Sequence, residues 1–134
     1  MTLPTLATAL RAQAQGLYYL EAAAELLVSH ESFLHRNDFN GRFIHRGTSI
    51  TDGVTEMAEI DWPAAIAALN VGELPCSGGE HRILRIAASL AAGIPVDLRN
   101  AVTGLDHRNI NLVITAVLRA SGTRPSHREF HDHF

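Results

Sequence analysis

Residues 77–93 read SGGEHRILRIAASLAAG, and this stretch carries the signals that define a helix from start to end. Ser77 and Glu80 form the capping-box pattern, in which each side chain satisfies a backbone N–H group at the helix start. Apolar residues then recur at helical spacing until Gly93, a residue type that commonly follows the last turn. These apolar residues are Ile83, Leu84, Ile86, Ala87, Leu90 and Ala91. The stretch predicts an amphipathic helix with one face in a core.

Three aspartates mark the starts of three further helices. An aspartate at the N-cap accepts a hydrogen bond from a backbone N–H group of the first turn, and a glycine after the last turn favours termination. The first of these helices opens with Trp62-Pro63, and proline suits a first turn because it has no N–H group to leave unpaired. The predicted helices run from Asp61 to about Gly72, from Asp97 through Val102 to Gly104, and from Asp106 to Gly122.

A long amphipathic helix is predicted over residues 4–28. Its apolar residues alternate in steps of three and four, with one break at Gln13 and with Gly16 at mid-length as a place for a bend. An apolar stripe of this length is either the spine of the domain or a dimer contact, because both need the same pattern. The predicted interaction surface consists of Leu3, Leu6, Leu10, Leu17 and Leu20.

The segment after this helix has a less regular pattern. Residues 29–43 either extend the first helix or form a second short one that stops at Asn40-Gly41. Apolar residues on both sides of Arg46-Gly47 predict a small hairpin near residues 43–50, and residues 51–53 have the composition of a turn. The expected fold is all-α, a compact bundle of about five helices with this hairpin. We expect one helical domain over residues 1–122 and a flexible, histidine-rich tail at 123–134.

Composition limits the classes of protein to which the chain can belong. Its 134 residues fit one domain, and a net charge of −3 gives no general attraction to nucleic acid or anionic lipid. Charged residues interrupt the apolar runs well before the roughly 20 residues that cross a bilayer, and the N-terminus lacks the pattern of a secretory signal. The single cysteine, Cys76, agrees with a reducing compartment. We expect a cytoplasmic protein without membrane contact.

Residues 83–118 have the element order of a three-helix DNA-binding core: a helix, a short helix, a turn and a longer helix. The turn Thr103-Gly104-Leu105-Asp106, followed by Ile110, resembles the turn and the first buried residue of helix-turn-helix domains. The resemblance implies that the helix starting at His107 contacts DNA, since Asn and Arg side chains form paired hydrogen bonds with base edges. The implied contact residues are His107, Arg108, Asn109 and Asn111. The sequence departs from the family at Asn100, where those domains usually have a small residue.

The loop Cys76-Ser77-Gly78-Gly79-Glu80 resembles the signature loop of ABC-type ATPases. The resemblance implies anion binding at Ser77, Gly78 and Gly79, because a helix N-terminus directs free N–H groups and the positive end of its dipole at a phosphate. The sequence has neither a Gly-x-x-x-x-Gly-Lys-Ser/Thr loop nor any lysine. We therefore expect no nucleotide hydrolysis and no cofactor, and the simpler interpretation of the loop is a helix cap.

Two further sets of side chains have nucleophile or metal chemistry. Cys76 precedes a helix start, with His81 as a nearby base, but the pair has no third group to orient it. We expect Cys76 to be a small buried thiol. The tail histidines His127, His131 and His133 have the spacing of nickel or zinc ligands if the tail becomes helical. Because a flexible tail loses conformational entropy when it becomes ordered around a metal ion, we expect metal binding there to be weak and adventitious.

The residues of this sequence complete no catalytic constellation, so we expect a protein that is not an enzyme. The favoured hypothesis is a non-enzymatic regulatory or protein–protein interaction module, which binds a protein partner or forms a homodimer along its first helix. The alternative hypothesis is a helix-turn-helix-like DNA-binding regulator that uses the helix starting at His107.

Overall fold

The computed structural model describes residues 3–123, with side chains from residue 5 onward. This range is mostly helical, with seven α-helices, one short 3₁₀ helix and a two-stranded antiparallel sheet. The elements are α1 (Leu3–Ala14), α2 (Tyr18–His30), η1 (Ser32–His35), α3 (Asn37–Phe43), β1 (Ile44–Thr48), β2 (Glu56–Ile60), α4 (Trp62–Asn70), α5 (Gly78–Ala92), α6 (Leu98–Thr103) and α7 (His107–Ala120). The predicted helical character and the hairpin are confirmed, whereas the predicted number of about five helices is too low.

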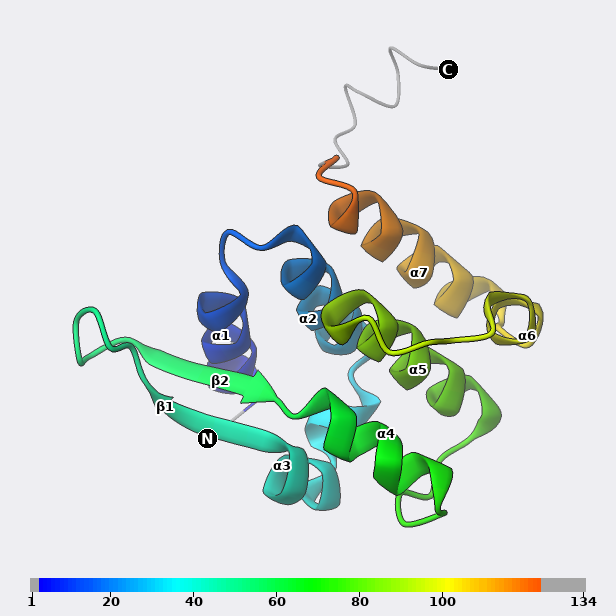
Figure 1. The fold of residues 1–134 in the computed structure, drawn as a ribbon, viewed down its shortest axis with the longest axis horizontal. Coiled ribbons are helices and arrows are strands. Elements are labelled where there is room, and N and C mark those ends of the chain that lie inside the picture. The colour runs from blue at the N-terminus through cyan, green and yellow to red at the C-terminus, as the bar shows by residue number, and fades with distance from the viewer. Residues whose placement is uncertain (1–2, 124–134) are drawn as a thin grey trace.

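Helix α2 is the central element, and α1, α5 and α7 pack against it (Figure 1). Three consecutive alanines at positions 22–24 are buried, and their small side chains allow neighbouring backbones to approach. Leu26 and Leu27 project into the core from the following turn. A helix that is apolar on most of its circumference is stable only in an interior. The position of α2 therefore follows from its sequence.

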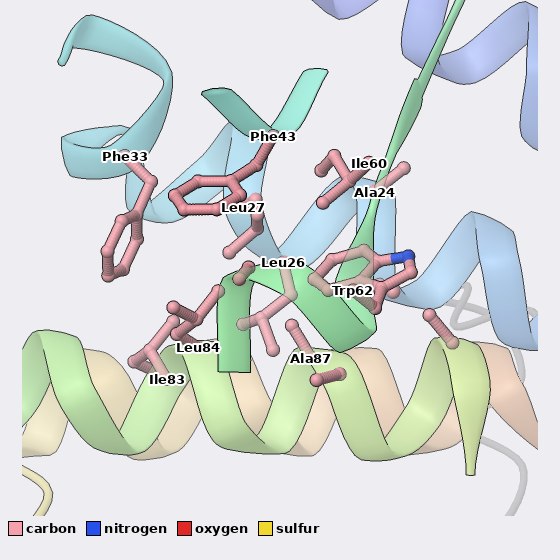
Figure 2. Packing of buried hydrophobic residues seen from close by; sticks show 14 of the residues in the cluster. Ala24, Leu26, Leu27, Phe33, Phe43, Ile60, Trp62, Ile83, Leu84 and Ala87 are labelled. Atoms are coloured by element: carbon pink, nitrogen blue, oxygen red, sulfur yellow. The ribbon is translucent and has the colours of Figure 1, made fainter. Parts of the chain in front are cut away.

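The hydrophobic core extends from α2 to the hairpin, α4 and α5 (Figure 2). Phe43 and Ile60 come from the base of the hairpin, Trp62 from the first turn of α4, and Ile83 and Leu84 from α5. One continuous core thus joins the N-terminal and C-terminal halves of the described chain. No helix among residues 3–123 is long and apolar enough to cross a bilayer.

All four predicted N-caps are confirmed. Ser77 accepts a hydrogen bond from the Glu80 N–H group at 3.2 Å, and the Glu80 carboxylate accepts one from the Ser77 N–H group at 2.8 Å. Asp61, Asp97 and Asp106 each accept a bond from the backbone N–H group three residues later. Each such bond stabilises its helix by about 1 kcal/mol, because it satisfies a donor that has no partner within the helix.

The predicted single helix over residues 4–28 is wrong, because the chain reverses direction at Gly16. This glycine has φ = 93°, a left-handed conformation that a residue with a Cβ atom adopts at a cost. The Gly16 N–H group donates to the Glu21 carboxylate at 2.9 Å, which fixes the start of α2. Helix α1 then folds back onto α2, and Arg11 forms an ion pair with Glu25 at 2.5 Å.

Two details of residues 29–60 also differ from the prediction. Asn40 and Gly41 do not stop a helix but lie within α3, where the Asn40 amide donates to the Leu34 carbonyl oxygen at 2.7 Å. Arg46-Gly47 does not form the hairpin turn but lies inside β1, which pairs with β2 from Ile44 opposite Ile60 to Thr48 opposite Glu56. The turn lies at residues 49–55, where the Asp52 carboxylate accepts from the Val54 and Thr55 N–H groups.

Candidate functional site

An outer face of α7 is an apolar surface that the other described residues leave uncovered. Helices α2 and α7 run antiparallel, since Arg108 donates to the Ser29 carbonyl oxygen at 2.9 Å and Arg119 pairs with Glu21 at 3.2 Å. These contacts fix which side of α7 faces the core, where Val113 is buried. On the adjacent flank Ile114 and Val117 remain 52% and 51% exposed.

The start of α2 continues this surface at the end of α7. Tyr18 is 46% exposed, and its ring lies so close to Gly122 that a Cβ atom there would be 3.2 Å from Tyr18 Cε2. Ile110, one turn before Ile114, is partly exposed. We call Ile110, Ile114, Val117 and Tyr18 the α7 face. None of these four side chains carries a charge, which distinguishes the face from the arginine-bearing flank of the same helix.

The reversal at Gly16 separates the residues that were predicted as an interaction surface. Leu6 and Leu10 are 2% and 3% exposed and belong to the core within one chain, and Leu20 is partly buried against the same core. Leu17 is 44% exposed beside Tyr18. The side chain of Leu3 lies outside the described part of the structure. Among the residues whose side chains are described, the apolar stripe therefore serves mainly as the spine of the domain, and Leu17 in its middle reaches the surface.

The residues implied as DNA contacts divide into two pairs. His107 and Asn111 are exposed on α7. Asn109 is only 8% exposed, and Arg108 is engaged with Ser29. A side chain reads a base edge only if its polar end is free to enter a groove, so burial removes Asn109 from the implied contacts, whereas Arg108 is exposed and donates through one nitrogen atom only. DNA binding through α7 stays a prediction.

The start of α5 is filled by the protein's own side chains. The capping box places the Glu80 carboxylate at the N–H group of Ser77, and a negative charge there opposes an incoming anion. Arg82 Nη1 would lie 2.9 Å from a Cβ atom at Gly78, and the Asn109 amide 3.4 Å from one at Gly79. The two glycines thus make room for neighbouring side chains. Anion binding at Ser77, Gly78 and Gly79 stays a prediction without support from this geometry.

Sequence reasoning missed a cationic pocket between α5 and the segment that leads into α6. Its volume is about 390 Å³, and His81, Arg82, Arg85, Pro95, Val96, Asp97, Asn100 and Ala101 line it. Arg85 donates to the Asn70 side-chain oxygen at 2.5 Å and to His81 Nε2 at 3.3 Å. The available signal was the spacing of His81, Arg82 and Arg85, because residues one turn apart share one helix face. We call this pocket the α5–α6 pocket.

The remaining candidates offer no assembled chemistry within the described residues. Burial raises the pKa of the Cys76 thiol, which disfavours the thiolate that a nucleophile needs. Residues 3–123 contain no group of three or more His, Cys, Asp or Glu side chains placed to hold a metal ion. The predicted tail ligands His127, His131 and His133 lie outside the described residues.

Acid is expected to weaken the junction of α2, α5 and α7 through His30. Its ring is 8% exposed, and burial, followed by the charge of Arg108, lowers its pKa despite opposing effects of Glu80, Asp106 and Glu31. In the folded protein the pKa of His30 lies below its ordinary value of 6.5. Neutral His30 therefore contributes fully to the free energy of unfolding above pH 6.5, and this contribution is lost as the pH falls through the pKa of the folded state.

Urea unfolding on both sides of pH 6.5 measures this effect. His30→Leu should lose less stability on acidification than the wild type does. His35→Leu, at an exposed histidine, should keep the full loss. Equal pH dependence in wild type and His30→Leu would show that His30 is not the titrating group.

No family model matches this sequence, and no curated protein or solved structure shows significant similarity to it.

Proposed function

We propose that this chain is a non-enzymatic protein-interaction module that self-associates through the α7 face. The observation that carries the proposal is the half-exposed state of Ile114, Val117 and Tyr18 on two helices whose orientation the contacts at both ends fix. Contiguous exposed apolar side chains of this kind mark interaction sites in soluble proteins, because their burial against a partner removes apolar area from water.

The chemistry of the face favours a second copy of the same chain. In a two-fold symmetric dimer the same patch meets itself, so a charged patch would repel its own copy. The α7 face has no charged side chain. Ile110, Ile114 and Val117 are spaced at i, i+4 and i+7, the spacing at which one helix packs against another. A pair of α7 helices related by a two-fold axis is therefore the expected contact.

Two carboxylates with shifted pKa values have structural roles, in agreement with the proposal of a non-enzymatic module. Asp38 and Glu80 have lowered pKa values, the first because of its hydrogen bond with Arg36 and the second because of its bond from the Ser77 backbone. Both carboxylates act as structural partners within the fold. Catalytic groups usually show pKa shifts toward the working pH in a shared cleft, and these two carboxylates shift away from it.

Sedimentation equilibrium over a concentration series tests the proposal. The wild type should dimerise, and Val117→Asp should weaken the dimer by about thirtyfold or more, since it places a charge in an apolar contact. Val71→Asp is the matched control, because Val71 is 69% exposed at the end of α4 and outside the α7 face. A wild type that stays monomeric at all concentrations, or equal effects of the two variants, would contradict self-association through α7.

A further inference from the structure

The α5–α6 pocket has an excess of positive charge in a chain whose net charge is −3. Two guanidinium groups and one imidazole line it against a single carboxylate, that of Asp97. The Asp97 carboxylate accepts a hydrogen bond from the Asn100 N–H group at 3.2 Å and serves as the N-cap of α6. Burial, followed by the charges of Arg85 and Arg82, lowers the pKa of His81, so the excess positive charge of the pocket at neutral pH comes from the two arginines.

The two arginines of this pocket are the partly buried ones among the described arginines without a carboxylate partner, because Arg46, Arg99 and Arg108, which also lack one, are exposed. Arg11, Arg36, Arg42 and Arg119 each form an ion pair with an Asp or Glu side chain. Arg82 and Arg85 form none within residues 3–123, although both are partly buried. A partly buried cation is costly unless an anion offsets it, so the pocket favours an anionic ligand.

Neutral oxygens hold the two guanidinium groups in position. Arg82 donates to the carbonyl oxygens of Asn100 at 3.2 Å and Gly78 at 3.1 Å, and Arg85 donates to the Asn70 side chain at 2.5 Å. These bonds restrict the side chains without neutralising their charge. A site whose cations are already positioned loses less conformational entropy when a ligand binds.

We propose that the α5–α6 pocket binds the phosphoryl group of a small molecule, with Arg82, Arg85 and His81 as the anion contacts. A guanidinium group matches the oxygens of a phosphoryl group with paired N–H donors. Pro95, Val96 and Ala101 form the apolar part of the wall, beside which the body of the ligand lies. The volume of about 390 Å³ lies in the range of small-molecule sites. This proposal is independent of self-association through α7.

Titration with inorganic phosphate, followed by NMR on the full chain, tests the site. Resonances of residues 81–85 and 95–101 should shift with saturation, and the pKa of His81 should rise as bound phosphate offsets the two arginines. Arg85→Gln should weaken binding by about tenfold or more. Arg46→Gln is the control, because Arg46 is exposed on β1 and has no carboxylate partner among the described residues.

Acetate and duplex DNA at low salt complete the experiment. Acetate binding as tight as phosphate binding overturns the phosphoryl assignment. DNA binding that needs Arg85, in a protein that does not bind phosphate, overturns the small-molecule assignment. Three other results also overturn the proposal. They are resonance shifts that do not saturate with added phosphate, shifts that are unchanged in Arg85→Gln, and a pKa of His81 that does not rise when phosphate is added. Urea unfolding confirms that Arg85→Gln is folded, and Arg82→Gln gives a second, independent removal of a phosphate contact.

Discussion

Phe39→Ala is expected to lower the free energy of unfolding by about 3–5 kcal/mol, because it removes the middle ring of a buried aromatic cluster. The Phe39 ring is fully buried. Its centroid lies 5.1 Å from that of Phe33 and 5.4 Å from that of Phe43, in tilted arrangements that favour aromatic pairs. Removal of the middle ring therefore takes contacts from both neighbours and leaves a cavity between η1, α3 and the base of the hairpin.

Urea unfolding followed by circular dichroism measures this loss. Phe39→Leu should cost less, because it leaves a smaller cavity. Val54→Ala is the control at a site that is 78% exposed in the hairpin loop, and its effect should stay within about 0.5 kcal/mol. A Phe39→Ala protein as stable as the control would show that the three rings do not pack as described.

Gly104→Ala is expected to destabilise the protein by about 1 kcal/mol, because the added methyl group displaces the end of the Arg82 side chain from its hydrogen bonds. The backbone of Gly104 has φ = −99° and ψ = 3°, which other residues adopt without strain. The need for glycine is spatial, because a Cβ atom at this position would lie 2.2 Å from Arg82 Cζ. The guanidinium group must then leave the carbonyl oxygens of Asn100 and Gly78.

A double-mutant cycle separates this collision from a backbone effect. In the Arg82→Ala background, Gly104→Ala should cost little, because the obstructing side chain is gone. Gly93→Ala is the contrasting case, since Gly93 has φ = 69° and nothing within 4 Å of its Cβ position. Its cost should persist in the Arg82→Ala background. Equal costs of Gly104→Ala with and without Arg82 would refute the spatial explanation.

The parts of the fold that follow from local chemistry were predicted correctly from the sequence. A Ser-x-x-Glu box or an aspartate before an apolar period needs only residues within one turn, and the starts of α4, α5, α6 and α7 all follow this rule. The turn predicted at residues 51–53 is confirmed, but the placement of Arg46-Gly47 at the centre of the hairpin was wrong because two patterns competed. Arg46-Gly47 has the composition of a turn, but Asp52 binds two backbone N–H groups and Gly53 has φ = 67°, which place the turn later.

Features that depend on contacts between segments far apart in the sequence could not be predicted from the spacing of residues along the chain. Apart from the break at Gln13, apolar residues recur every three or four positions both before and after Gly16. The pattern alone therefore does not distinguish one long helix from two helices that pack on each other. The α5–α6 pocket needs residues 81–85 and 95–101 together, and only the first group forms a recognisable pattern. Asn109 is polar at the start of an amphipathic helix, yet α5 covers it near Gly79.

The central position of α2 also determines when the chain can fold during its synthesis. The contacts that fix α2 against α7 join residues 79 and 98 positions apart, Ser29 with Arg108 and Glu21 with Arg119. A ribosome must therefore release nearly the whole described chain before the alanine-rich surface of α2 is covered on all sides. Before that point α2 can pack only against elements that precede α7 in the sequence, among them α1, η1 and α5. The final face of the core is therefore completed only when α7 has been synthesised.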